Sequence, residues 1–196
     1  MSEQVISPDL NFVREVIGSG GESLKKCFQC ATCSVVCHVT PDDNPFPRKE
    51  MMLAQWGQKD KLFGNPDVWL CHQCSDCTAY CPRGAKPGEV LNAIRKLSLA
   101  HYSSPSFLAK MVGSPKFFLV LFAVPLVIYF LILSSIGHLD FSQPYLNSRG
   151  QMSYSAFLDP TFYIDPVFIG AALFAVIVFS RGIVRYWKDM KQHAGP

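Results

Sequence analysis

The chain has 196 residues, a formal net charge of +3 and 49% hydrophobic residues. This length allows one or two domains, and so small a charge excess argues against a protein that binds nucleic acid. The apolar residues are concentrated after residue 116, so we expect a polar, soluble-like first half followed by a membrane-like second half.

A first helix is predicted to begin at Ser7-Pro8-Asp9, with a capping hydroxyl, proline at the first helical position and an acid in the first turn. Apolar residues follow at helical spacing, at Leu10, Val13, Val16 and Ile17. Gly18-Ser-Gly-Gly21 ends this helix, and no Gly-Lys-Ser/Thr follows, so the glycine-rich turn is not a phosphate loop.

Two cysteine runs with the same spacing come next. The second run is C-x2-C-x2-C-x3-C followed by Pro82, the iron–sulfur pattern of bacterial ferredoxins, and the first run repeats it without the proline. A cubane cluster needs thiolates that converge from several directions. Three cysteines two residues apart wrap a loop around one face of the cluster, and the fourth begins a helix that points away. Together the two runs use all eight cysteines of the chain.

The pattern predicts two [4Fe-4S] clusters with crossed ligation, because the fourth cysteine of each run ligates the other cluster in two-cluster ferredoxins. The ligands expected for cluster one are Cys27, Cys30, Cys33 and Cys81. The ligands expected for cluster two are Cys71, Cys74, Cys77 and Cys37.

Two other uses of these cysteines fit the sequence less well. Zinc sites favour paired C-x2-C knuckles and not triplets with a trailing fourth cysteine. A disulfide framework needs an oxidising compartment, and the residues before Cys27 do not resemble a secretory signal.

The 33 residues between the runs are predicted to be mainly helical. Pro41, Pro45 and Pro47 form a stiff connector, Arg48 to Trp56 forms a helix that stops at Gly57, and Lys59 to Phe63 forms a further turn. Met51, Met52 and Trp56 are the packing residues expected on the longer helix. A small β-hairpin ferredoxin has no such insert, so the fold class predicted is all-α, with an α-helical ferredoxin domain.

Several residues near the cysteines have two possible roles. His38 follows Cys37 and either donates a hydrogen bond to cluster sulfur or is simply solvated, and we favour solvation. Phe46, Trp56 and Trp69 either form a docking face for a partner protein or pack around the clusters.

A long helix is predicted from Pro87 to about Tyr102. Its apolar face contains Val90, Leu91, Ile94, Leu97 and His101. Arg95 and Lys96 are expected to face away from it, and His101 to be a surface or capping residue.

The second half is predicted to be a transmembrane helical hairpin. Phe117 to Ile136 runs without a charge and is long enough to span the ~30 Å hydrocarbon core, with a kink expected at Pro125. After a polar loop over residues 138–165, the second span begins at Asp165-Pro166 and continues through Val167 to Ser180 toward Trp187. The predicted organisation is a ferredoxin domain at 1–104, an interfacial linker at 105–116, the two-helix region at 117–187 and a tail at 188–196.

Basic residues predict the orientation. They precede the first span and crowd the end of the second, whereas the loop between them has Arg149 against three aspartates. The positive-inside rule therefore places both termini and the cluster domain in the cytoplasm, as a multi-pass protein of the inner membrane. Iron–sulfur clusters and free thiols also suit that reducing side.

Three fragments give the chain a resemblance to a known family. Over about residues 8–103 the chain resembles the C subunits of heterodisulfide reductases. The fragments that carry this resemblance are Cys27-Phe-Gln-Cys30-Ala-Thr-Cys33, Phe46-Pro-Arg-Lys-Glu50 and Trp69-Leu-Cys71-His-Gln-Cys74, with Cys81-Pro-Arg-Gly84. That family is the iron–sulfur electron carrier beside flavoprotein subunits. With a membrane half attached, the chain is most similar to the C subunits of quinone-interacting membrane-bound oxidoreductase complexes.

The resemblance implies a membrane-anchored electron relay without a substrate-converting site of its own. Electrons would pass between menaquinone and flavoproteins related to the A subunits of heterodisulfide reductases. The expected context is dissimilatory sulfur or sulfate metabolism with adenylylsulfate reductase, and either direction of flow fits the residues. Two alternatives are a component of a heterodisulfide or thiol reductase, which needs a further cysteine-rich motif, and a membrane-tethered redox sensor.

The membrane part of the C subunits in those quinone-interacting complexes is normally longer and binds haem b. A bis-histidine haem needs two imidazoles from neighbouring spans, and neither Phe117 to Ile136 nor Val167 to Ser180 contains a histidine. Haem b and menaquinone binding are therefore expected only if additional transmembrane helices are supplied. His138 could then provide one haem ligand. Arg181 and Arg185 are expected mainly against lipid phosphate.

Overall fold

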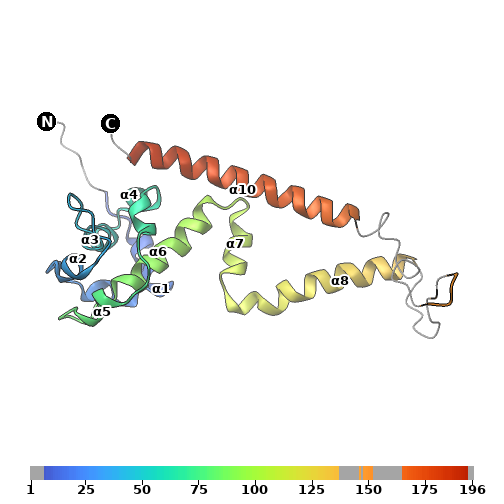
Figure 1. Ribbon diagram of the computed structural model, residues 1–196, viewed down its shortest axis with the longest axis horizontal. Coiled ribbons are helices and arrows are strands. Elements are labelled where there is room, and N and C mark those ends of the chain that lie inside the picture. The colour runs from blue at the N-terminus through green and yellow to red at the C-terminus, as the bar shows by residue number, and fades with distance from the viewer. Residues whose placement is uncertain (1–6, 137–145, 147, 152–164, 194–196) are drawn as a thin grey trace. The chain divides into compact units, whose positions relative to one another are not determined.

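The computed structural model describes residues 7–136, 146, 148–151 and 165–193. The described secondary structure is helical apart from a single bridge residue at Leu146, in agreement with the predicted all-helical class. Two compact units are present: residues 1–103 together with 182–196, and residues 104–181. Figure 1 shows the chain in the order of its helices.

The described residues of the first unit form six α-helices, two 3-10 turns and the end of a further long helix. In chain order these are α1 (Leu10–Gly18), η1 (Glu22–Lys26), α2 (Thr32–Val36), α3 (Arg48–Gln55), α4 (Lys59–Phe63), η2 (Pro66–Trp69), α5 (Asp76–Ala79), α6 (Pro87–Tyr102) and the last part of α10 (Asp165–His193). Helix α6 has the predicted bounds.

The start of α1 differs from the prediction. Asp9, and not Ser7, caps the helix, because its carboxylate accepts hydrogen bonds from the backbone N–H groups of Asn11 (2.9 Å) and Phe12 (3.0 Å). The helix is therefore shifted along the sequence, Phe12 enters the core, and Leu10 is exposed. An aspartate at this position supplies the N-terminus with both a cap and a negative charge.

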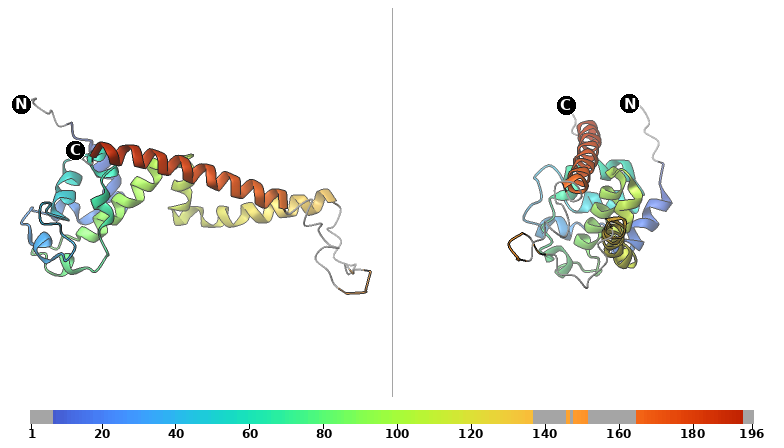
Figure 2. Two further views of the ribbon diagram at one scale, coloured as in Figure 1. Left: turned by 45° about the horizontal axis from the view of Figure 1, so that its top comes forward. Right: turned by 90° about the vertical axis from the view of Figure 1, so that its right-hand side faces the viewer.

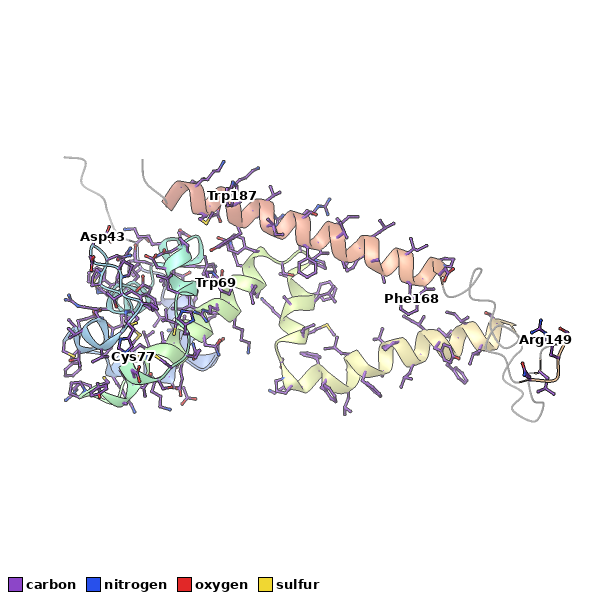
Figure 3. The ribbon with its side chains drawn as sticks, in the orientation of Figure 1. Asp43, Trp69, Cys77, Arg149, Phe168 and Trp187 are labelled. Carbon is purple, nitrogen blue, oxygen red and sulfur yellow. The ribbon has the colours of Figure 1, made fainter. Side chains whose placement is uncertain are left out.

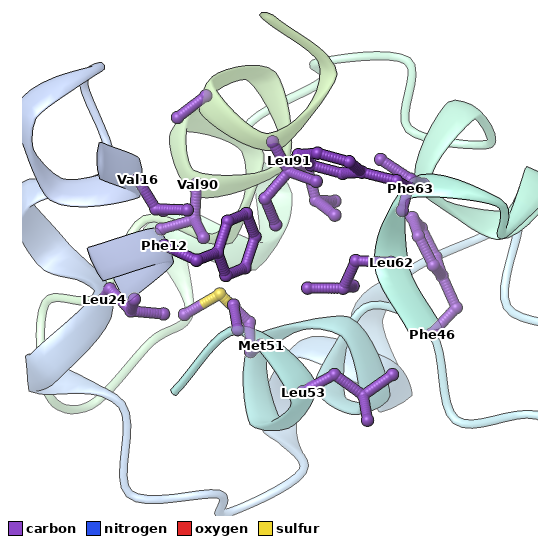
Figure 4. Packing of buried hydrophobic residues seen from close by; sticks show 14 of the residues in the cluster. Phe12, Val16, Leu24, Phe46, Met51, Leu53, Leu62, Phe63, Val90 and Leu91 are labelled. Carbon is purple, nitrogen blue, oxygen red and sulfur yellow. The ribbon is translucent and has the colours of Figure 1, made fainter. Parts of the chain in front are cut away.

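The core lies where α1, α3, α4 and α6 meet. Figure 4 shows Phe12 and Met51 pointing toward one another, with Leu62 and Leu91 beside them. Phe12 and Phe63 meet edge to face with ring centroids 5.4 Å apart. Cys27, Cys37 and Cys71 pack against this cluster from the outside, so the same core that holds the helices together also fixes the ends of the cysteine loops.

Gly57 joins α3 to the start of α1. Its φ is +66°, and its carbonyl accepts a hydrogen bond from Asp9 N–H at 3.1 Å. A Cβ at position 57 would lie 2.6 Å from the carbonyl oxygen of Asp9. Only glycine fits this close approach with a left-handed backbone. Trp56 was predicted to pack; it follows the last turn of α3 and is 49% exposed.

The end of α6 contacts the last part of α10 within the first unit. Tyr102 Oη donates a hydrogen bond to Asp189 Oδ2 at 2.8 Å, and the rings of Tyr102 and Tyr186 meet edge to face at 5.3 Å. Burial, followed by the Asp189 carboxylate, raises the pKa of Tyr102. His101 is exposed, as predicted, and its ring lies between those of Phe63 and Tyr102.

The second unit contains α7 (Ser106–Val112), η3 (Pro115–Phe117), α8 (Phe118–Ile136) and the first part of α10. Two helical stretches, Pro115–Ser135 and Asp165–Gln192, are long and apolar enough to cross a membrane. Pro125 lies inside α8, which Figure 2 draws in yellow as one continuous helical ribbon. Most large apolar side chains of α8 and α10 are exposed, Phe168 among them (Figure 3), whereas Leu133 is buried. The predictions for residues 1–6 and for His138 and most of the loop fall outside the described residues.

Candidate iron–sulfur site

The two cysteine runs fold into the same loop. In the first, Gln29 and Ala31 have φ values of 60° and 67°; in the second, Gln73 and Ser75 have 60° and 71°. These residues occupy the same places in each run, two and four positions after the first cysteine. The left-handed turns bring the chain around between the cysteines, and the second of them leads directly into α2 or α5.

The second run shares a cavity with the last cysteine of the first run. Cys37 lines a cavity of about 320 Å³ together with the three cysteines predicted to share a cluster with it, Cys71, Cys74 and Cys77. Phe46, Gly88 and Leu91 form part of the wall. The tertiary structure thus brings together the whole ligand set predicted for cluster two.

The thiols of the first run lie close to one another and to the second run. Burial, followed by the neighbouring thiols of Cys27, Cys77 and Cys30, raises the pKa of Cys33 to about 11. Helices α2 and α5, which follow the two left-handed turns, pack against each other. The described contacts do not join Cys81 to the first three thiols, but by the internal repeat it is the counterpart of Cys37.

Several N–H groups point at cysteine sulfur. Gln29 Nε2 lies 3.6 Å from Cys27 Sγ, and Gln73 Nε2 lies 3.6 Å from Cys71 Sγ. Backbone N–H groups donate to Cys71 from Gln73 at 3.4 Å and to Cys81 from Ala85 at 3.3 Å. Such donors stabilise sulfur that carries negative charge, as in a thiolate bound to iron.

The surroundings of Cys30 and Cys77 shift the pKa values of these two thiols in opposite directions. At Cys30, hydrogen bonds from the Thr32 hydroxyl and backbone N–H lower the pKa of the thiol. At Cys77, burial raises the pKa, while an N–H bond from Gly88 opposes the rise. Thiols with raised pKa values must lose a proton to bind iron, so cluster assembly would release protons.

The donor set suits a cluster better than a single ion. Within the described part of the chain, no group of three or more His, Cys, Asp or Glu side chains converges closely enough to hold one metal ion. Four soft thiolates spread around a cavity of this size fit a [4Fe-4S] cubane, which cysteine ligates through separate irons.

Each loop is also held by one side chain from a helix distant in the sequence. Gln55 Nε2, at the end of α3, donates to the carbonyl oxygens of Leu24 (2.9 Å) and Cys27 (2.8 Å). Arg95, on α6, donates through Nε to Val68 O (2.9 Å) and through Nη2 to Cys71 O (2.8 Å). The prediction placed Arg95 off the apolar face of α6 and gave it no role, whereas in the structure its long side chain reaches the second cysteine loop.

Gln29 and Gln73 could have been found from the sequence. Both runs read Cys-x-Gln-Cys, with glutamine at the same position. Gln55 and Arg95 carry no such signal, since their chemical types differ and they lie 28 and 24 residues from the cysteines whose carbonyls they bind. Only the fold shows that they occupy matching places.

The remaining predictions near the site have mixed outcomes. His38 is largely exposed, with Nε2 4.0 Å from Asp76 Oδ2, as expected for a solvated residue. Phe46 is 1% exposed and packs in the core, so it is not part of a docking face. Trp69 is partly exposed (Figure 3), and the Arg95 guanidinium lies 5.5 Å from its ring centroid.

Comparison with known families supports the class of site that this geometry suggests. Residues 23–85 match the family model described as 4Fe-4S dicluster domain. That range contains all eight cysteines, both left-handed loops and the helical insert between them.

The curated relatives include the C subunits of heterodisulfide reductases. The chain is 34% identical over 110 residues to the C subunit of the H(2):CoB-CoM heterodisulfide,ferredoxin reductase of Methanothermobacter marburgensis, covering 54% of this chain and 57% of that protein. It is 34% identical over 93 residues to a protein of Archaeoglobus profundus described as like the C subunit of heterodisulfide reductase, covering 46% and 50%.

A third relative is the C 2 iron-sulfur subunit of the CoB–CoM heterodisulfide reductase of Methanocaldococcus jannaschii, 32% identical over 115 residues, covering 51% of this chain and 61% of that protein. The chain spans about half the length of the curated relatives it matches. The resemblance to the C subunits of heterodisulfide reductases, predicted from the cysteine motifs, is therefore confirmed for that part of the chain.

Proposed function

We propose that this protein is an electron carrier with two [4Fe-4S] clusters. Cluster one is ligated by Cys27, Cys30, Cys33 and Cys81. Cluster two is ligated by Cys71, Cys74, Cys77 and Cys37. The observation that carries the proposal is the cavity in which Cys37 of the first run meets the three closely spaced cysteines of the second.

Iron analysis and electron paramagnetic resonance test this assignment. Anaerobically purified protein should contain iron and labile sulfide in equal amounts, at about four of each per cluster. Reduction should give the signals of two clusters. A single mononuclear metal ion per four cysteines, or zinc in place of iron, would contradict the proposal.

The clusters serve transfer of single electrons and not conversion of a substrate. All eight cysteines are taken up by the two ligand sets, so no thiol is left to act as a redox-active pair on a disulfide substrate. The three relatives above are named as C subunits of heterodisulfide reductases or as proteins like them, which supports a role beside partner proteins.

The fuller proposal is a relay between the menaquinone pool and flavoproteins related to the A subunits of heterodisulfide reductases, with adenylylsulfate reductase as a further partner. It rests on the sequence resemblance and on the two apolar helices. Membranes that contain the protein should show cluster reduction when a menaquinol analogue is added. Clusters that dithionite reduces but the quinol analogue never does would remove the quinone from the proposal.

We place the protein in the inner membrane, anchored by α8 and α10 with both termini on the cytoplasmic side. The exposed apolar side chains along both helices support contact with lipid. A topology reporter fused after Gly150 should be active in the periplasm, and one fused after Pro196 should be active in the cytoplasm. The reverse pattern would overturn this orientation.

Haem b belongs to the proposal only when additional membrane helices supply histidines. The described residues of α8 and the apolar part of α10 contain no histidine. The chain expressed by itself should therefore carry iron–sulfur clusters without low-spin haem. A Soret band at one haem per purified chain would show that ligands exist elsewhere in the sequence.

A further inference from the structure

The two cluster loops are supported at equivalent positions by side chains of different charge. Each loop begins with a 3-10 turn, and each supporting side chain donates to two carbonyls: that of the residue three positions before the first cysteine, and that of the first cysteine itself. For the first run these donors come from Gln55, and for the second from Arg95, with all four distances between 2.8 and 2.9 Å.

The glutamines inside the loops follow the same division. Gln29 donates to Cys27 Sγ and also to Gln55 Oε1 at 3.0 Å. A guanidinium has no acceptor atom. At the second run the corresponding Gln73 accordingly donates to the backbone carbonyl of Gly88, also at 3.0 Å. Arg95 therefore takes the structural place of Gln55 and adds a full positive charge.

That charge lies against the first ligand of cluster two. Arg95 is partly buried, and its guanidinium is held through Cys71 O, on the same residue whose sulfur is assigned to the cluster. An arginine stays protonated at all physiological pH values. Reduction adds one negative charge to a cluster, so a nearby cation stabilises the reduced form and raises the reduction potential.

We propose that Arg95 is a tuning residue that raises the reduction potential of cluster two, and that Gln55 gives cluster one the same backbone support without this electrostatic effect. The inference rests on the proposed function, because it requires both clusters. Other cations lie near the sites. The charge of Arg48 helps to lower the pKa of Cys30, the Arg83 guanidinium lies 3.9 Å from the centroid of the Phe28 ring, and Lys86 forms an ion pair with Glu89. The inference therefore concerns the change at each site when the charge is moved, and not the absolute order of the two potentials.

Arg95→Gln is the direct test, since it keeps an amide donor like that of Gln55 and removes the charge. The full-length protein, reconstituted in detergent, is titrated with dithionite and followed by electron paramagnetic resonance at low temperature. At a fixed solution potential, the ratio of reduced to oxidised cluster two should fall about tenfold, as expected for one unit charge at roughly 12 Å in an effective dielectric of about 20. For a one-electron couple this is a downward shift of about 59 mV.

The reciprocal variant Gln55→Arg should raise the reduction potential of cluster one. Arg95→Lys, which keeps the charge, should leave the reduction potential of cluster two close to its original value. Lys96→Gln is the matched control, because it removes one charge from the next residue of the same helix, where the side chain is exposed. Lys96→Gln should leave both couples in place. The Arg95→Gln and Gln55→Arg effects should fall on different couples.

The outcomes separate this inference from the proposed function. A wild-type protein with one cluster or none contradicts the proposed function. Two clusters whose potentials do not move in Arg95→Gln, or move together by equal amounts, overturn the role of Arg95 while leaving the carrier function intact. If Arg95→Gln does not assemble cluster two, the Gln55→Arg and Arg95→Lys variants decide. The inference is supported if Gln55→Arg raises the reduction potential of cluster one and Arg95→Lys leaves that of cluster two unshifted. It is overturned if Gln55→Arg does not raise the potential of cluster one.

Discussion

The two cysteine runs share a backbone but differ in what holds them. Both contain left-handed residues at the same positions and a glutamine that donates to the first sulfur. The first run is held by Gln55 at the end of α3, two residues before Gly57, which binds the start of α1 at Asp9. The second run is held by α6 through Arg95 and Gly88. Repeated local sequence thus produces repeated loops, while the surrounding helices make the two sites chemically different.

The largest effect is expected from the cysteines that cross between the runs. Cys37→Ser should disrupt the cluster held by Cys71, Cys74 and Cys77, because Cys37 lines their cavity. Iron content should fall by up to about half, and the remaining paramagnetic signal should be that of cluster one.

Cys81→Ser is the matched variant and should remove the opposite signal. If each serine variant instead removes the cluster of its own run, the ligation is not crossed. The two runs would then be independent sites and not a coupled pair.

A second test asks how far the first run depends on α1. Gly57→Ala forces a left-handed alanine into a position where its Cβ would lie 2.6 Å from Asp9 O. We expect a loss of about 3 kcal/mol or more, seen as a lower temperature for bleaching of cluster absorbance, with the first-run cluster lost earlier.

Gly18→Ala is the control, since a Cβ there has no neighbour within 4 Å and the backbone is helical. It should be neutral or slightly stabilising. Simultaneous loss of both clusters in Gly57→Ala would indicate that the two runs share their support.

A third difference lies in the carboxylates of the supporting helices. Glu50 on α3 is fully buried, neither of its carboxylate oxygens has a hydrogen-bond partner among the described residues, and burial raises its pKa to about 7. The pKa of Glu50 is higher in the folded state than in the unfolded state. The protonated side chain therefore contributes to the free energy of unfolding at low pH, and this contribution is lost as the pH rises through about 7.

Glu50→Gln should therefore stabilise the protein, and its advantage should grow by about 1 kcal/mol between about pH 6 and about pH 8.5. The measurement is the midpoint of thermal cluster loss at each pH. Glu89→Gln on α6 serves as the control, because Glu89 is exposed and pairs with Lys86 at 2.9 Å. An advantage for Glu50→Gln that does not depend on pH would show that Glu50 is ionised in the folded protein.

The smallest expected effect tests the symmetry of the loops. Ala31→Gly and Ser75→Gly relieve left-handed strain at φ values of 67° and 71°. Each should stabilise the protein by about 0.5–1 kcal/mol, and by the same amount in both runs. Ala79→Gly, in the exposed part of α5, should destabilise by a similar amount. Unequal gains at 31 and 75 would show that one loop is more strained than the other.

Predictions from sequence succeeded where the signal was local. The bounds of α6 followed from Pro87 at its start and the apolar spacing behind it, and the stretch Phe118–Ile136 followed from an uncharged apolar run. The start of α1 was misplaced because Ser7 and Asp9 are both acceptable caps, and only the burial of Phe12 in place of Leu10 distinguishes them. The role of Phe46 could not be decided from its residue type, because an aromatic side chain can pack in a core or form part of a docking surface.

The sequence by itself determined the cysteine spacing, the repeated loop, the helical insert and the apolar second half, because each depends on residues only a few positions apart. Tertiary structure decided what those loops contact: that Cys37 enters the cavity of the second run, and that Gln55 and Arg95 take equivalent places. These contacts join residues 24 to 40 positions apart, and their chemistry depends on where the core places α3 and α6 around the loops. A charge for which the sequence predicted no role thereby lies beside one cluster site, with a neutral amide beside the other.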